Sequence, residues 1–449
     1  MIIFSGKFSS NAYTPESCTV KNTSESSYEK YDNDNNNIGS QILKTNNGSI
    51  VLPAKNYIPF SNPLWYTTAN IKLYKFGIRI LEMNNICYDL QTKKFDIFIN
   101  RGDSTKTTNT INRFHDFITT NKLYKTIENE IIYNKTKNIW IIHAAYDYQI
   151  AHFQEAANNM ITIANHPELF PKVDMVLWPT RTNKVYSWIQ EYTNLIHELY
   201  PSTVPFYRNN DIYRIFGNRF CLEHVDVVHR IMNPLFGNIF ADPIEAYYVR
   251  VLAYKYIGYD IASKKYTVPY VTIVNRTPRT NLYNRQIRNI DEIMREFNSS
   301  FSGLFNCRSE LIIMDFLKLQ EVVSIMVKTD ILVGAVGSGL INSLFMLPFS
   351  VVIMFFPTTS QDHYFYNLSY CTDIYILPSY NASLNHYPSP KFDNCNKTIN
   401  KYGVILNNYT CNHFAYMDDV YISPNILYHL LYIANLYLKQ KKYFIQYEF

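Results

Sequence analysis

The seven cysteines of this 449-residue sequence include no CxxC pair. A zinc site or a redox-active dithiol of the usual spacing therefore has no support, and no metal site is predicted. Cys371, Cys395 and Cys411 fall in a loop-rich region where a disulfide can form. Buried free thiols explain the same three residues equally well, so both interpretations stay open.

Clustered charge and long apolar runs are also missing. The net charge is +5, with lysine and arginine scattered along the chain. This distribution excludes the basic face of a nucleic-acid-binding protein but suits an anionic small molecule. No run of about 20 apolar residues occurs, so no transmembrane segment is predicted. The apolar stretch at the N-terminus is too short for a signal peptide.

The length predicts two domains of roughly 200 residues, and alternating strands and helices predict the α/β class. Apolar runs that read as strands buried on both faces indicate parallel sheets, which bind ligands at the carboxyl ends of their strands. The predicted strands are 139–146, 173–178, 221–229, 269–275, 310–315, 330–335 and 350–356, and the predicted helices are 152–166, 183–200, 243–265, 289–297, 317–329 and 339–346. The predicted parts are a disordered or irregular arm (1–50), an acceptor-side domain (51–245), a nucleotide-binding domain (246–422) and a C-terminal helix (423–449).

Glycine is scarce, with 13 residues, yet Gly334, Gly337 and Gly339 lie within six positions, between a predicted strand and a predicted helix. Glycine lets a backbone approach a ligand closely, and a helix N-terminus presents free N–H groups, so Gly337-Ser338-Gly339 suits an anion such as a diphosphate. The turn lacks the Gly-Lys-Ser/Thr ending of a Walker loop. Its spacing also differs from GxGxxG, which argues against an NAD-binding oxidoreductase. Tight packing of strand on helix is the alternative use of these glycines.

Arginines gather at another predicted strand end, in "VNRTPRTNLYNRQIRNIDEI" (274–293). Arg276, Arg279, Arg285 and Arg288 provide guanidinium groups, which bind phosphate oxygens in bidentate fashion. A solvated loop is the alternative for any single one of them. Because arginine-bearing and glycine-bearing strand ends belong to one predicted sheet, a joint anion site is favoured.

A third candidate motif opens the predicted helix 152–166. His152 and Glu155 are three residues apart and therefore share a helix face. A histidine with a carboxylate can act as a general base. A capped helix start with a hydrogen-bonded histidine is the alternative.

Taken in order, these motifs resemble glycosyltransferase family 61, which includes the EGF-domain O-GlcNAc transferase, the protein O-mannose β-1,4-N-acetylglucosaminyltransferase and plant xylosyltransferases. The resemblance covers roughly 140–360 and is strongest over 269–357, where "R…R-x-I-x-N-x-x-E" precedes "D-hydrophobic-VG-x-x-G-x-GL-x-N-x-LF-x-x-P". It implies a GT-B fold, in which two Rossmann-like domains face each other across a cleft. It also implies inverting transfer of a hexosyl or pentosyl group from a nucleotide sugar, mostly UDP-linked, to a glycan or protein hydroxyl, with no strict metal requirement.

The resemblance also assigns roles to residues. His152 or Glu155 would take the proton of the acceptor hydroxyl, which attacks the anomeric carbon opposite the leaving diphosphate. Arginines and the N–H groups of the glycine turn would stabilise the charge that develops on the diphosphate. The donor-side residues assigned in this way are Arg276, Arg285, Asn289, Gly337, Ser338, Gly339 and Asn342.

Two positions depart from the family pattern. Val336 stands where the family usually has histidine, and Met354 or Phe355 stands where it usually has an acidic residue. Both changes leave the glycines in place but remove polar groups that would serve the donor. Two functions are therefore carried forward: an active transferase with a different donor preference, and an inactive relative that binds nucleotide sugar, glycan or protein. The resemblance implies the lumen of the ER or Golgi and the missing signal peptide indicates the cytoplasm, so the compartment stays open.

Overall fold

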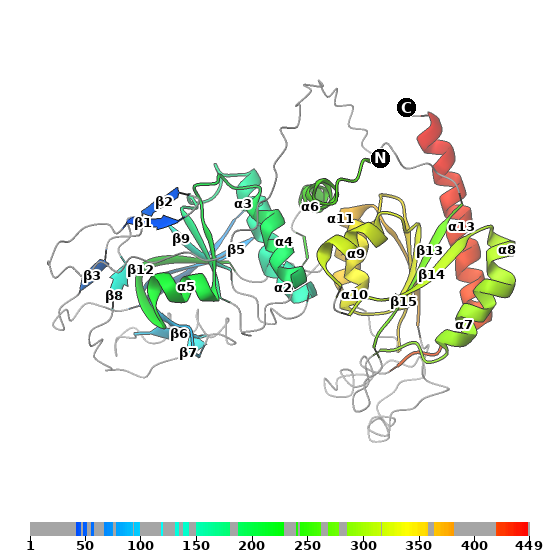
Figure 1. The fold of residues 1–449 in the computed structure, drawn as a ribbon, viewed down its shortest axis with the longest axis horizontal. Coiled ribbons are helices and arrows are strands. Elements are labelled where there is room, and N and C mark those ends of the chain that lie inside the picture. The colour runs from blue at the N-terminus through cyan, green and yellow to red at the C-terminus, as the bar shows by residue number, and fades with distance from the viewer. Residues whose placement is uncertain are drawn as a thin grey trace, which may run out of the picture. The chain divides into compact units, whose positions relative to one another are not determined.

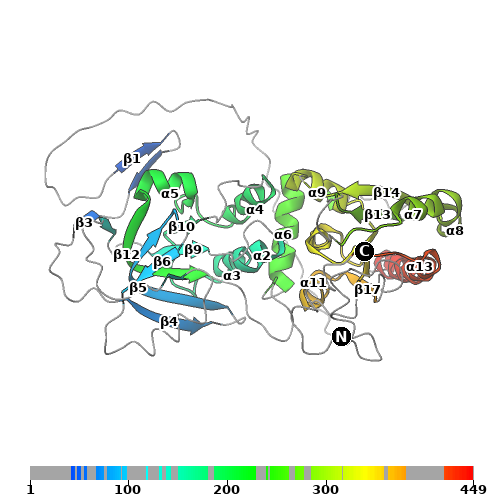
Figure 2. The same cartoon turned by 90° about the horizontal axis from the view of Figure 1, so that it is seen from below.

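The computed structural model describes residues 42–45, 48–51, 55–57, 67–74, 78–92, 94–98, 118–119, 131–133, 138–142, 150–179, 187–228, 239–240, 243–261, 268–277, 285–315, 317–357, 363–380 and 419–447. By its internal contacts the chain divides into two units, residues 1–54 and 55–449. In the first unit, β1 (Ile42–Thr45) pairs antiparallel with β2 (Gly48–Val51). This ladder occupies the end of the predicted irregular arm. The remaining elements belong to the second unit (Figures 1 and 2).

One half of the first large sheet is parallel. It contains β9 (Ile139–Ile142), β10 (Met175–Trp178), β11 (Phe206–Arg208) and β12 (Arg219–Val228), in the spatial order β11-β10-β9-β12. Both β9 and β10 are buried along their whole length, as the apolar runs predict. The predicted strand 139–146 ends four residues earlier, at Ile142.

Helices connect these strands. α2 (Ile150–Ala157) and α3 (Asn159–Asn165) follow β9, α4 (Ser187–His197) follows β10, and α5 (Asn209–Phe216) follows β11. The single predicted helix 152–166 is therefore two helices, with Asn158 between them. The Asn158 amide is buried, where it donates to the Ile239 carbonyl at 2.8 Å and accepts from the Tyr192 hydroxyl at 2.5 Å. These two hydrogen bonds to distant residues accompany the break between α2 and α3. Helical periodicity in the sequence does not reveal this break.

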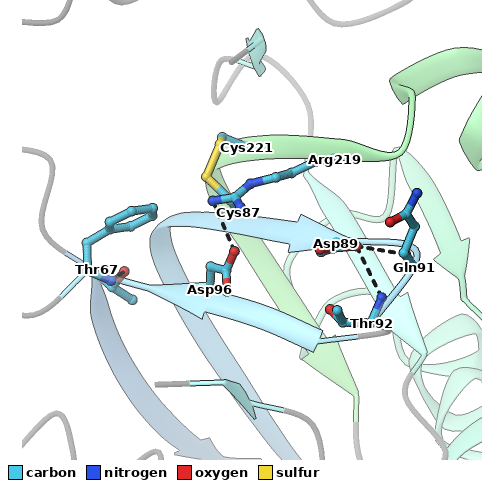
Figure 3. A network of polar contacts seen from close by, with 9 residues as sticks. Thr67, Cys87, Asp89, Gln91, Thr92, Asp96, Arg219 and Cys221 are labelled. Carbon is cyan, nitrogen blue, oxygen red and sulfur yellow. Dashed lines mark hydrogen bonds and ion pairs between the residues drawn. A yellow bond between two sulfur atoms is a disulfide. The ribbon is translucent and has the colours of Figure 1, made fainter. Parts of the chain in front are cut away.

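The other half of the sheet is antiparallel and centres on β5 (Arg79–Asp89), which pairs with β12 and with β4 (Thr68–Leu73) and β6 (Lys94–Ile97). Three short strands complete the sheet: β7 (Ile118–Thr119) pairs parallel with β6, β8 (Ile131–Tyr133) pairs parallel with β12, and β3 (Lys55–Tyr57) pairs antiparallel with β8. Cys87 and Cys221 stand directly opposite each other on β5 and β12 and form a disulfide (Figure 3). The same view shows the ion pair between Arg219 and Asp96, at 3.0 Å.

This disulfide differs from the one considered from the sequence. Cys371 is a buried free thiol, which agrees with the second of the two interpretations for that residue. Cys395 and Cys411 lie outside the described residues. The pairing of Cys87 with Cys221 was not predicted, because nothing in the sequence aligns two strands that are 134 residues apart.

The second large sheet is wholly parallel, as predicted. Its strands are β13 (Tyr270–Asn275), β14 (Arg308–Ile313), β15 (Ile331–Ala335), β16 (Val351–Phe355) and β17 (Tyr375–Ser379), in the order β14-β13-β15-β16-β17. Side chains alternate between its faces: Val351, Ile353 and Phe355 enter one apolar core, whereas Val352 and Met354 enter the other.

Figure 1 shows helices on both faces of this sheet. On one face lie α7 (Ile290–Glu296), the short helices η3 (Phe297–Phe301) and α8 (Ser302–Phe305), and the long α13 (Pro424–Tyr447). On the other lie α9 (Leu319–Met326), α10 (Ser338–Ile341), η4 (Asn342–Phe345) and α11 (His363–Thr372). None of the described helices is long and apolar enough to cross a membrane.

α6 (Pro243–Tyr256) links the two sheet layers, and the predicted domain boundary at 245/246 falls inside it. The helix packs against α4 of the first layer and against α9 and α11 of the second. Arg250 is buried and donates to the carbonyls of Leu344 at 3.0 Å and Thr372 at 2.8 Å. The helix is shorter than the predicted 243–265, because Gly258 leaves the helical conformation with φ +65°.

Candidate donor site

The strand order of the parallel sheet marks one place on its edge. β13 is the first strand, and its neighbours β14 and β15 lie on opposite sides of it. In sheets of this order the connections on the two sides diverge, which opens a crevice at the carboxyl ends of the first and third strands. Here Arg276 follows β13, and Val336 and Gly337 follow β15. The sequence-predicted arginine and glycine therefore flank the switch point.

Gly337 touches both predicted arginines. Its backbone has φ +153°, in a region that side chains rarely adopt. A Cβ on this residue would overlap Nη2 of Arg276 and lie 3.3 Å from Cζ of Arg285. Only glycine leaves room for the two guanidinium groups, which meet here from different segments of the chain. The arginines and the glycine predicted to form a joint anion site therefore lie together, and anion binding there stays a prediction.

The other two glycines of the cluster have different surroundings. A Cβ at Gly334 would lie 2.9 Å from Cδ2 of Leu340 and 3.2 Å from the carbonyl oxygen of Val274, so this glycine serves strand–helix packing. A Cβ at Gly339 would meet only Cγ1 of Val274, at an ordinary 3.7 Å. Gly334 therefore fits the packing interpretation, whereas the anion-binding interpretation of Gly337 stays a prediction.

Backbone contacts hold the loop that carries Arg276. The amide N–H of Thr277 donates to Oδ2 of Asp315, just beyond β14, at 2.9 Å. The carbonyl of Arg276 accepts from Nε2 of Gln286 at 3.4 Å. These bonds tie the loop after β13 to its neighbouring strand and to the Arg285 segment.

Arg285 has a left-handed backbone, with φ +53°. Two residues later the backbone of Ile287 is held by the buried side chain of Asn275, the last residue of β13. Oδ1 of Asn275 accepts from the Ile287 N–H at 2.8 Å, and Nδ2 donates to the Ile287 carbonyl at 3.2 Å. The strand end that precedes Arg276 thereby also fixes the segment that delivers Arg285.

Two residues predicted to contact the donor have other partners. Nδ2 of Asn289 donates to Oε2 of Glu292 and to the carbonyl of Ile422, and its Oδ1 accepts from the Ile422 N–H. Asn342 is buried, and its Nδ2 donates to the Gly339 carbonyl at 3.1 Å. Both amides hold the protein's own backbone, and their contact with a donor stays a prediction.

The model of the family described as Glycosyltransferase 61 matches residues 172–353. This region belongs to glycosyltransferase family 61. The match confirms the resemblance seen in the sequence for this part of the chain, and the family is one of sugar transferases. The matched range contains Arg276, Arg285 and Gly337. It begins after α2 and ends just before Met354. No curated protein matched the chain.

Val336 inside the glycosyltransferase 61 region and Met354 just past its end, the two departures from the family pattern, are apolar and buried. Val336 and Met354 have no exposed surface and belong to the core on the α9–α11 face. Phe355 belongs to the opposite core, under α13. Of these two neighbours on β16, Met354 is therefore the one on the face of the sheet that carries α10.

The predicted acceptor-side pair lies on α2, which packs against α10. Glu155 is buried, with 2% of its surface exposed. The side chain of His152 lies outside the described part of the structure. Nearby, burial raises the pKa of the Tyr192 hydroxyl far above its ordinary value, and the buried Glu245 raises it further. Among the described side chains, no three histidines, cysteines or carboxylates form a cluster suited to a metal ion.

Sequence reasoning missed the residues that support the two arginines. Asn275 was interpreted only as part of a buried strand, although its amide organises the Arg285 segment. Asp419 follows a long stretch of sequence in which no motif is recognised. No local signal connects it to a segment about 130 residues earlier.

Proposed function

We propose that this protein is an inverting glycosyltransferase that moves a hexosyl or pentosyl group from a UDP-sugar to a hydroxyl of a glycan or protein. The observation that carries the proposal is the contact of Gly337 with the guanidinium groups of Arg276 and Arg285. This contact lies at the switch point of a parallel sheet, inside the region assigned to glycosyltransferase family 61.

The chemistry of the site fits a diphosphate. Two guanidinium groups side by side repel each other unless an anion lies between or beside them, and each can bind phosphate oxygens in bidentate fashion. In the proposed reaction the diphosphate leaves with growing negative charge, which Arg276, Arg285 and the N–H groups of Ser338 and Gly339 stabilise. The donor is a co-substrate, and the proposed site neutralises its charge without a metal ion.

A GT-B arrangement is part of this proposal. Each of the two large sheets has parallel strands, and α2, which follows the first strand of one, packs against α10, which follows the third strand of the other. His152 on α2 is the proposed base for the acceptor hydroxyl. Glu155, three residues on and buried, is proposed to support that histidine rather than to reach the acceptor. Attack from the α2 side, opposite the leaving diphosphate, inverts the anomeric centre.

A second function is an inactive relative that binds nucleotide sugar, glycan or protein. The observation that favours it is the complete burial of Val336 and Met354, both apolar where the family usually has polar groups. This alternative keeps the diphosphate contacts and loses turnover, so it predicts UDP binding without catalysis.

The first experiment is UDP binding by calorimetry to the parent chain and to Arg276→Ala and Arg285→Ala. Each substitution removes a charge-assisted contact, for which we expect roughly 10- to 100-fold weaker binding. Arg295→Ala is the matched control, because Arg295 is an exposed arginine in the last turn of α7. Unchanged binding in both site variants would refute the donor site.

The second experiment incubates the protein with a panel of nucleotide sugars and glycan or peptide acceptors, and measures nucleotide release and product stereochemistry. Release together with an inverted linkage supports the transferase. Measurable UDP binding with no release from any donor supports the inactive relative.

A further inference from the structure

The segment that carries Arg285 is paired on its outer side with the residues that precede α13. Ile287 and Val420 form a parallel bridge. The N–H of Val420 donates to the Gln286 carbonyl, and the N–H of Arg288 donates to the Val420 carbonyl, both at 2.9 Å. Asn275 holds the same segment from the inner side. The segment between Arg285 and Asn289 is thus fixed along both edges.

The side chain of Asp419 contacts this segment at two points. It is buried, with 2% of its surface exposed. Its Oδ1 accepts from the N–H of Gln286 at 2.8 Å, and its Oδ2 forms an ion pair with Nη2 of Arg288. One carboxylate therefore holds both the backbone N–H of Gln286, next to Arg285, and the side chain of Arg288.

The left-handed backbone of Arg285 makes this support important. A residue with a side chain adopts φ +53° at a cost relative to the ordinary helical or extended regions. The conformation persists only when neighbouring contacts determine it. The N–H of Gln286, immediately after Arg285, would lose its buried acceptor without Asp419, and the peptide would be free to rotate away from Gly337.

The anchor itself is rigid. Beyond Asp419, Tyr421 donates its hydroxyl to Oε2 of Glu292 at 3.0 Å, and Ile422 exchanges two hydrogen bonds with Asn289. α13 then begins at Pro424 and buries Leu427 and Leu431 in the core under the sheet. Displacing Asp419 therefore means disturbing a well-packed helix start.

We propose that Asp419 is a positioning residue for donor binding: it fixes the guanidinium of Arg285 against Gly337 and does not itself touch the diphosphate. The inference rests on the proposed donor site. It assigns a part of that site to a residue outside the matched family region 172–353. The competing explanation is that Asp419 only stabilises the fold.

The test measures UDP affinity and thermal stability for Asp419→Ala and for Asp330→Ala. Asp330 is a matched control, because Oδ2 of this partly buried aspartate also accepts a backbone N–H, from Tyr270 at 2.9 Å, but at the opposite edge of the same sheet. We expect both variants to lose stability and only Asp419→Ala to bind UDP about tenfold more weakly. Equal UDP affinity in the two variants would overturn the positioning role.

A double-mutant cycle separates positioning from direct contact. If Asp419 acts through Arg285, then Asp419→Ala weakens UDP binding in the parent but not in Arg285→Ala. Additive losses would overturn the proposal, because they mean that Asp419 acts by another route. If both Arg276→Ala and Arg285→Ala leave UDP binding unchanged, the donor site itself fails, so the two failures are distinguishable. Asp419→Asn keeps an acceptor for Gln286 and should bind UDP nearly as the parent does; a loss as large as in Asp419→Ala would mean that this acceptor does not position Arg285.

Discussion

The glycine cluster offers a sharp test, because the three glycines differ in what a methyl group would meet. In Gly337→Ala the new Cβ overlaps the Arg276 guanidinium. The alanine must also either hold the backbone at φ +153° or shift the turn to another conformation. Holding a side chain in that region costs about 1–3 kcal/mol. The clash is with the far end of a flexible side chain, so Arg276 moves aside rather than the strand.

Donor affinity should therefore suffer more than the fold. Losing one charge-assisted contact to the diphosphate corresponds to roughly 10- to 100-fold weaker UDP binding. Turnover should fall further, by about 100- to 1,000-fold, because a guanidinium that stabilises the leaving group acts mainly in the transition state. The assay is UDP calorimetry and nucleotide release, each with a melting temperature for the same preparation.

Gly339→Ala is the matched control two residues away. Its Cβ has an ordinary 3.7 Å contact with Val274 and no left-handed backbone to maintain. We expect UDP affinity within twofold of the parent and stability unchanged or raised by about 0.4–1 kcal/mol. If Gly337→Ala and Gly339→Ala bind UDP equally well, Gly337 does not bring the arginines to a ligand, and the reasoning fails.

Three other predictions concern separate parts of the chain. Cys87→Ser should lower the free energy of unfolding by about 5 kcal/mol in denaturant titrations, because the disulfide with Cys221 closes a loop across 134 residues; reductant should affect the parent equally and the variant not at all. His152→Gln should reduce turnover by about 100- to 10,000-fold and leave UDP affinity unchanged; parent-like turnover would exclude it as the base. Burial, with Asp211 nearby, raises the pKa of Tyr207 to about 12, so the folded state holds this proton more tightly than the unfolded chain. Stability from this group is complete below pH 10 and is lost as the pH rises to about 12, and Tyr207→Phe should flatten that part of the profile.

The central parallel strands, such as β9, β10, β15 and β16, were predictable because they are buried on both faces and leave uninterrupted apolar runs. β13, β15 and β16 lie within a residue of the predicted limits. The meeting of Arg276 with Gly337 also followed from sequence, since strand ends of a parallel sheet share one edge. Helix limits were less accurate, as α10 and η4 replace one predicted helix.

The rest depends on partners far along the chain. β5 pairs with β12 in a register that no local pattern specifies, and the Cys87–Cys221 bond is a consequence of that register. Asp419 reaches the Arg285 segment only because α13 returns across the sheet. Asn289 is the opposite case. Its position in a motif was recognised from the sequence, but its contact with the residues that precede α13, at the Ile422 carbonyl, was not.

The long separation between β5 and β12 has a consequence for biosynthesis. The ribosome completes β5 well over a hundred residues before its principal partner, which at 5–20 residues per second is a delay on the order of ten seconds. During that interval the nascent chain exposes an unpaired edge of β5 and a free thiol, Cys87. Correct pairing must wait for Cys221, so the first sheet can close only after most of its helices have been made. Yield of the native disulfide, rather than stability of the finished protein, is then the step most sensitive to the conditions of expression.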